Sequence, residues 1–138
     1  MSEPAQAEQM MPLAAGLGVQ TVEATTEQVR LRLPWSPEVC TSGGIMHGGA
    51  IMALSDTAGA LLAFLNLPPG SAGTTTTDSH TRFLGAVRAG HAEAVSRVLH
   101  KGRTLIAVDT EVRDSGGRLV ARTSQAQLVL SPRDPGTG

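Results

Sequence analysis

Apolar and polar residues alternate along several segments of the chain, with the period of two that is typical of half-buried β-strands. The clearest case is 27–33, where Val29, Leu31 and Leu33 alternate with Gln28, Arg30 and Arg32. Other segments are rich in β-branched residues, and Asp114-Ser115-Gly116-Gly117 is a strong hairpin signal between two of them. We therefore expect strands over 18–24, 27–33, 74–84, 91–100, 103–113 and 119–130.

One long apolar run separates the second and third of these strands. Residues 50–65 are mostly Ala, Leu, Ile, Met and Phe, which favour a helix, and the run is too long for an ordinary strand. Apolar residues fall all around this helix, so something must wrap it. The pattern predicts an α+β fold, an antiparallel β-sheet curled around one long central helix that ends before Pro68-Pro69-Gly70.

The length of 138 residues fits a single domain, which we expect over 10–131. Residues 1–9 and 132–138 are polar or rich in small residues and are expected to form disordered tails.

Charge and composition narrow the function further. Eleven Lys and Arg balance twelve Asp and Glu, and aromatic residues make up 2% of the chain. Both features argue against a nucleic-acid partner. The single cysteine, Cys40, cannot form an internal disulfide and fits a reducing compartment. The N-terminus lacks a signal-peptide pattern, and the run 50–65 is shorter than the roughly 20 residues of a membrane span. We expect a cytoplasmic protein with no membrane contact.

Asp56 is the only Asp, Glu, Lys or Arg between Glu38 and Asp78, and it lies in the middle of the apolar helix. Burying an unpartnered carboxylate costs several kcal/mol. Two structural explanations would remove that cost: an exposed position, or hydrogen bonds from a neighbouring strand. The alternative is a carboxylate kept for chemistry.

The helix begins at His47-Gly48-Gly49. Two glycines at a helix start leave backbone N–H groups open at the positive end of the helix dipole, where a carbonyl oxygen that gains charge would be stabilised. A plain glycine-rich turn is the alternative. A metal site from His47 and Asp56 is disfavoured because their spacing does not place them on one helix face, so no metal is expected.

Gly48 and Asp56 are eight residues apart, which is about 12 Å along a helix. A reacting carbonyl must lie about 3 Å from its oxyanion donor and from its base or nucleophile. One helix cannot satisfy both distances. If the two residues act together, they come from two antiparallel copies of the chain, with two equivalent sites in a homodimer.

Four segments of the chain carry a family resemblance. They are 47–56 with its HGG-x6-D spacing, 76–84, 101–104 before a strand, and 117–121. The sequence resembles the hotdog-fold acyl-CoA thioesterases, specifically the PaaI-like and 4-hydroxybenzoyl-CoA thioesterase group, over residues 12–130.

The resemblance implies a thioesterase that hydrolyses an aromatic or medium-chain acyl-CoA, with no cofactor, as a homodimer or a dimer of dimers. In the family pattern Gly48 matches the amide that polarises the thioester carbonyl. Asp56 matches the nucleophile or general base, His47 the residue that orients the helix start, and Thr76 a hydroxyl position near the carboxylate that can hold water.

The resemblance also implies substrate-binding residues. Arg103 and Thr104 match positions that contact coenzyme A, Arg82 is a further candidate for its phosphates, and Gly49 belongs to the open helix start. Thr41 replaces the Asn or Gln that the family often has there, and Gly85-Ala86 replaces its usual Pro. Both departures leave the acyl group undefined.

Two other functions fit a related fold. The first is a non-catalytic acyl-CoA-binding or ligand-sensing module, which would not need Asp56. The second is a hydratase or dehydratase, which would carry a His inside the helix where this sequence has Asp56.

Overall fold

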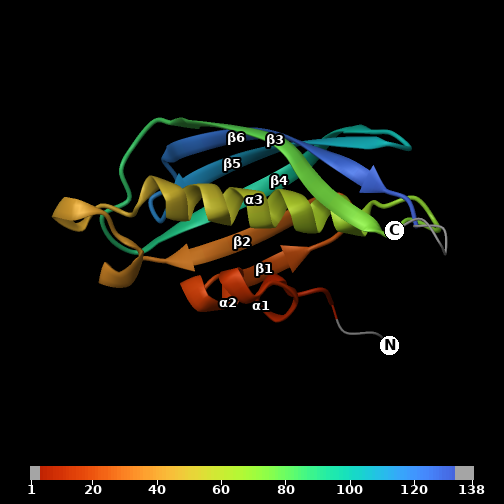
Figure 1. Cartoon of the computed structure of the whole chain (residues 1–138). Coiled ribbons are helices and arrows are strands. Elements are labelled where there is room, and N and C mark those ends of the chain that lie inside the picture. Colours follow the sequence, from red (N-terminus) through yellow and green to blue (C-terminus); the bar gives the residue numbers. More distant parts are fainter. Residues whose placement is uncertain (1–3, 133–138) are drawn as a thin grey trace.

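The computed structural model describes residues 4–132, which form a six-stranded antiparallel sheet wrapped around helix α3 (Figure 1). The strand order is β1-β2-β4-β5-β6-β3, and all neighbouring strands are antiparallel. The predicted α+β architecture is confirmed. The strands are β1 (Gln20–Ala24), β2 (Gln28–Pro34), β3 (Gly73–Phe83), β4 (His91–Lys101), β5 (Leu105–Asp114) and β6 (Leu119–Leu130).

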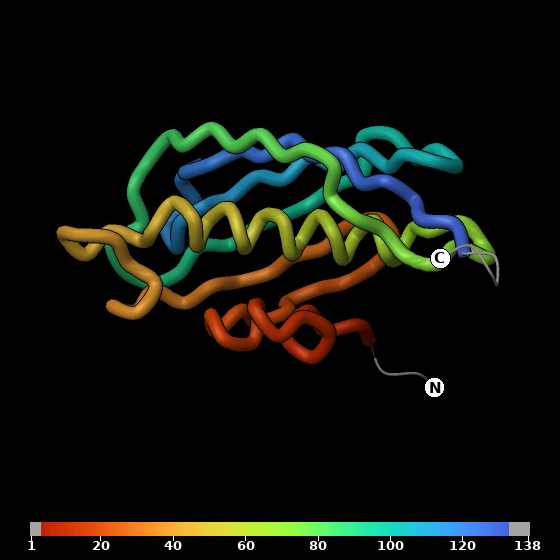
Figure 2. The backbone as a smooth tube through the Cα atoms, in the orientation of Figure 1, coloured from red at the N-terminus to blue at the C-terminus, as the bar shows by residue number. Residues whose placement is uncertain are grey.

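Helix α3 (Gly48–Leu65) lies along the concave face of the sheet, as the backbone tube makes clear (Figure 2). Leu54, Leu61 and Leu62 are fully buried, and they share the core with the inward side chains of β2 and β5. By length and composition α3 could cross a membrane, but 56% of it is buried inside the protein. Its apolar character is explained by the sheet that surrounds it.

Two short helices precede the sheet and lie beside β1 (Figure 1). They are α1 (Ala7–Met10) and α2 (Pro12–Leu17), and they change the expectation of a disordered tail over 1–9. Ala7 is fully buried, and its N–H donates to Thr21 Oγ1 at 2.8 Å. These helices are too short to give a visible period in the sequence. Residues 1–3 and 133–138, the rest of the two expected tails, lie outside the described residues.

The ends of the elements shift slightly from their predicted positions for local reasons. Gly18, expected in the first strand, has φ +92° and ends α2 as its left-handed cap, so β1 starts at Gln20. The central helix begins at Gly48, two residues before the apolar run. The turns η1 (Pro37–Val39) and η2 (Ser42–Gly44) bring the chain from β2 to that start.

Strand β3 forms one edge of the sheet. It pairs with β6 on one side, and its other side has no partner strand within residues 4–132. An unpaired strand edge is a template for another chain. The register slips between Thr76 and Asp78, so Thr77 is the extra residue of a β-bulge.

Candidate active site

The Asp56 carboxylate is half-buried and is held by the strands that α3 packs against. Its Oδ1 accepts a hydrogen bond from Thr76 Oγ1 at 2.8 Å and another from Gln125 Nε2 at 3.2 Å. Hydrogen bonds from neighbouring strands therefore hold this carboxylate, as the second of the two structural explanations for Asp56 requires. Oδ2 has no hydrogen-bond donor among the described residues, so half of the carboxylate is left for another molecule.

A second layer of hydrogen bonds fixes the direction of the first. Gln127 Nε2 donates to Thr76 Oγ1 at 2.6 Å, and the Thr74 hydroxyl lies within donating distance of both Gln127 Oε1 at 3.1 Å and the Leu128 carbonyl at 3.0 Å. A threonine hydroxyl has one proton, so Thr76 accepts from Gln127 and must donate to Asp56. The network thus holds the Asp56 carboxylate in a fixed orientation at the centre of the helix.

Sequence reasoning missed Gln125 and Gln127. Both are almost fully buried, at 2% and 0% exposure. Their signal is in the alternation of β6, where Thr123, Gln125 and Gln127 occupy positions that face the helix and would ordinarily be apolar. A run of polar residues on the inward face of a strand indicates a polar partner on the buried helix, and Asp56 is that partner.

Two backbone features allow Thr76 and Gln125 to reach Asp56. Thr76 stands directly before the bulge at Thr77, and bulges turn side chains toward a site. Gly59, one helical turn after Asp56, faces Gln125 so closely that a Cβ at this position would overlap the Gln125 amide. A larger residue at position 59 would therefore displace the Gln125 amide from its place beside Asp56.

His47 caps the start of α3. Its Nδ1 accepts a hydrogen bond from the Gly49 N–H at 2.7 Å, which assigns the ring proton of the neutral form to Nε2. The predicted orienting role of His47 agrees with this cap. The Gly49 amide, expected to be open, is occupied by the cap.

The Gly48 N–H is open. It has no acceptor in the part of the chain that the structure describes. The Phe83 ring covers the Cα of Gly48, and a Cβ there would lie 3.2 Å from Phe83 Cζ. The structure thus brings together Thr76 with Asp56, and His47 with Gly48, at two places on one helix about 12 Å apart.

The other predicted residues lie outside both places. Arg82 pairs across the strands with Arg122, on the face of the sheet opposite to that of Thr81 and Phe83. A hydrogen bond from Arg122 to Asp109, together with the Asp109 charge, raises the pKa of the Arg122 guanidinium.

Three further predicted residues lie in turns. Arg103 and Thr104 are exposed in the β4–β5 turn, at the end of the sheet where β3 begins, whereas Gly48 lies where β3 ends. Thr41 is exposed before η2.

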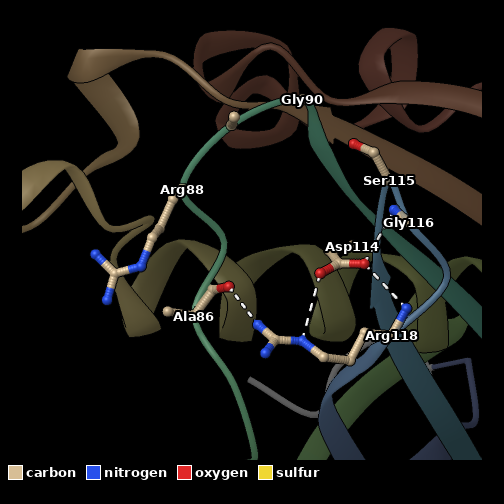
Figure 3. Close-up of a pocket in the computed structure, with 8 residues that line it drawn as sticks. Ala86, Arg88, Gly90, Asp114, Ser115, Gly116 and Arg118 are labelled. Carbon is tan, nitrogen blue, oxygen red and sulfur yellow. Dashed lines mark hydrogen bonds and ion pairs between the residues drawn. The ribbon is translucent and has the colours of Figure 1, made fainter.

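A cavity of about 600 Å³ lies between the β3–β4 loop and the β5–β6 turn (Figure 3). None of the predicted site residues lines it. Arg118 there donates to the Ala86 carbonyl at 2.9 Å and pairs with Asp114 at 3.5 Å, while Arg88 points away from Arg118. Arg88 and Arg118 therefore do not point to one common anion position, and we do not include this cavity in the candidate active site.

A second cavity of about 320 Å³ adjoins the start of α3, with His47 and Gly49 in its wall. Elsewhere among residues 4–132, no three His, Cys, Asp or Glu side chains gather as metal ligands would.

The antiparallel sheet around one long helix is the hotdog fold, and known structures share it. The thioesterase HI1161 of Haemophilus influenzae superposes with a TM-score of 0.85 at 20% identity, covering 97% of this chain and 96% of that one. The conserved protein PA5202 of Pseudomonas aeruginosa gives a TM-score of 0.81 at 30% identity, over 92% of this chain and 100% of that one.

The sequence comparisons give the family. The model of the thioesterase superfamily matches residues 43–121, more than half of the chain, from the turn before α3 into β6. The proofreading thioesterase EntH of Cronobacter turicensis is 28% identical over 120 residues, which cover 86% of this chain and 85% of EntH. The chain belongs to the thioesterase superfamily, whose chemistry is thioester hydrolysis.

Proposed function

We propose that this protein hydrolyses acyl-CoA thioesters to a free acid and coenzyme A, at two equivalent sites of a homodimer. Each site combines the Asp56 carboxylate of one subunit with the Gly48 amide of the partner subunit. The proposal rests on two open groups at different positions of α3. Asp56 has one oxygen that accepts hydrogen bonds and one that is free, and the Gly48 N–H at the helix tip has no acceptor among the described residues.

The two-fold arrangement follows from helix geometry. Gly48 and Asp56 of one chain are too far apart to reach the same carbonyl. Two antiparallel α3 helices bring Gly48 of each subunit beside the Asp56 carboxylate of the other subunit. The free edge of β3 supports this assembly, since two such edges can pair and extend the sheet across the dimer. The family resemblance also supports the pairing of two such dimers.

In the proposed reaction the thioester carbonyl oxygen accepts a hydrogen bond from the Gly48 N–H at the positive end of the helix dipole. Charge develops on that oxygen as the tetrahedral centre forms, and one preorganised donor of this kind contributes about 2.7–4 kcal/mol. The C–S bond then breaks, and coenzyme A leaves as the thiolate.

Asp56 acts through its free oxygen in one of two ways. It attacks the carbonyl carbon, giving a mixed anhydride that water hydrolyses, or it removes a proton from a water molecule that attacks directly. Thr76 and Gln125 hold the bound oxygen in either case, so we assign them a positioning role. His47 holds the helix tip through its cap.

For the rest of the substrate we keep the candidates named from the sequence. Arg103, Thr104 and Arg82 are exposed cations or donors available to the coenzyme A moiety. Thr41 lies before η2, and Gly49 is the second residue of α3. The acyl group would be aromatic or of medium length. No cofactor enters the reaction, and the free thiol of Cys40 supports a cytoplasmic location.

The test is thiol release from a panel of aryl- and fatty-acyl-CoAs, measured for the wild type and for Asp56→Asn. We expect turnover by the wild type, a loss of about 100- to 10,000-fold in kcat in the variant, and retained binding of an acyl-CoA thioether. Binding without thiol release by the wild type would instead support a non-catalytic acyl-CoA-binding module. Full activity in Asp56→Asn would contradict the assignment of the carboxylate.

A further inference from the structure

The second cavity lies between helix α2 and the first two turns of α3. Leu13 and Leu17 of α2 form one wall, and Ala50 and Ala53 of α3 form the other. His47 and Gly49 at its end connect it to the helix tip where the Gly48 amide is open. A molecule held by that amide therefore has an adjacent space in which to place its next atoms.

The wall of this space is mostly apolar, and its polar side chains are those of Glu38, His47 and Cys40. Small or aliphatic side chains supply most of its surface, and the His47 Nδ1 is already occupied by the Gly49 N–H. The one Asp, Glu, Lys or Arg in its wall is Glu38, an exposed residue of η1. The cavity offers no cation to a phosphate, so it does not suit the coenzyme A portion of the substrate.

We infer that this cleft receives the acyl group of the thioester, that Leu13 limits the length of the acyl chain, and that Glu38 rejects acyl groups ending in a carboxylate. The inference rests on the proposed function and adds the specificity of that site. Glu38 would give selectivity by repulsion. A terminal carboxylate of the acyl group beside Glu38 is disfavoured, whereas a terminal methyl group is not.

The cleft has a volume of about 320 Å³, near the lower end of the range of small-molecule sites. Its size therefore favours a compact acyl group, such as one aromatic ring or a medium-length chain. Leu13 is 67% exposed although it is apolar, and an acyl chain in the cleft would cover it.

The first experiment changes the size of the cleft. Leu13→Trp should lower kcat/KM for octanoyl-CoA by tenfold or more and change that for acetyl-CoA by less than twofold. Leu99→Trp is the matched control, since Leu99 is 64% exposed on β4 and does not line the cleft. An unchanged chain-length profile in Leu13→Trp, or an equal change in Leu99→Trp, would overturn the inference for Leu13.

The second experiment changes its charge. Hexanoyl-CoA and adipoyl-CoA have the same chain length and differ by a terminal carboxylate. Glu38→Gln should raise kcat/KM for adipoyl-CoA at least fivefold and leave hexanoyl-CoA within twofold. Glu27→Gln, an exposed change in the β1–β2 turn, should alter neither substrate. An unchanged adipoyl-to-hexanoyl ratio in Glu38→Gln would contradict the role of Glu38.

These results separate the inference from the proposed function. Hydrolysis with a profile that neither variant changes would leave the thioesterase in place and remove the cleft assignment. If no acyl-CoA is hydrolysed, the proposed function fails. Calorimetric binding of the octyl thioether of coenzyme A then tests whether the cleft binds the acyl group. Binding that Leu13→Trp weakens at least tenfold and Leu99→Trp does not would support the cleft, and equal or absent binding in all three proteins would overturn it.

Discussion

The middle and the tip of helix α3 differ in how much of their surroundings one chain supplies. Asp56 in the middle has donors from two strands on one oxygen, and a second layer of buried polar groups fixes those donors. Gly48 at the tip has an N–H with no acceptor in residues 4–132. One chain therefore holds one oxygen of the carboxylate in place and leaves both its other oxygen and the Gly48 N–H open, as we expect if a substrate between two subunits contacts both groups.

Removal of the open amide gives the largest effect among the variants below. Gly48→Pro deletes the N–H at the first helical position, where proline is well tolerated, and the extended backbone of His47 suits a following proline. We expect kcat to fall about 100- to 1,000-fold in a thiol-release assay.

Gly48→Ala is the control for this change. It adds the same Cβ against the Phe83 ring but keeps the N–H, so it should retain most of the activity. Equal losses in the two variants would assign the effect to the Phe83 contact and not to the amide.

The middle of the helix is tested by Thr76→Val. This variant has nearly the same shape but cannot donate to Asp56, and a hydrogen bond to a charged group contributes about 1.5–3 kcal/mol. We expect kcat to fall roughly 10- to 100-fold with KM little changed, and Thr76→Ser to restore most of it. A fall that Thr76→Ser does not restore would indicate that packing, and not the donated hydrogen bond, is what the site needs.

The close contact of helix and strand beneath Asp56 is tested by Gly59→Ala. The added Cβ must displace Gln125, which is buried, and overpacking of this kind costs about 1–3 kcal/mol. We expect a lower free energy of unfolding in urea, together with reduced kcat. Gly16→Ala, in α2 with open space around it, should instead be neutral or stabilising. Equal stability of the two variants would refute the tight approach of α3 and β6.

The smallest effect concerns the N-terminal helices that border the cleft. Partial burial raises the pKa of Glu8, but hydrogen bonds from the Thr21 hydroxyl and from backbone amides lower it more, so the net pKa lies below 4.5. Because the folded pKa is depressed, this contact stabilises α1 above about pH 4.5, and the stabilisation is lost as the pH falls through the folded pKa.

Hydrogen exchange at the Ala7 and Thr21 amides measures this contact. Protection, corrected for intrinsic exchange, should weaken on acidification, and Glu8→Gln should remove that pH dependence. The effect should be under about 1 kcal/mol because the carboxylate is only partly buried and solvent screens its charge. An unchanged pH dependence in Glu8→Gln would contradict the role of Glu8.

The sequence predicts features that rest on long local patterns better than features that rest on contacts between distant residues. The alternation in 27–33 and the apolar run 50–65 are long local signals, and they predicted the sheet and its central helix. Asp56 and the open helix start were visible because a charge in an apolar run and paired glycines break those patterns. The helices α1 and α2 escaped notice because four and six residues are too few to show a period.

The partners of Asp56 required the fold. Thr76 precedes a bulge whose position depends on strand pairing, and Gln125 lies 69 residues away from Asp56 along the chain. The Gly49 amide looked as open as that of Gly48, and only the conformation of His47 distinguishes them. The polar inward positions of β6 indicate that the helix carries a polar partner, but the side-chain contacts across the sheet decide which atoms meet.

Mixed dimers give the most direct test of shared sites. In a heterodimer of one Asp56→Asn subunit and one Gly48→Pro subunit, one site lacks both groups and the other has both. Each variant alone should be nearly inactive, and purified heterodimers, made with two different affinity tags, should recover about half of the wild-type turnover per dimer. Heterodimers as inactive as the two parents would contradict a site that takes its carboxylate and its amide from different chains.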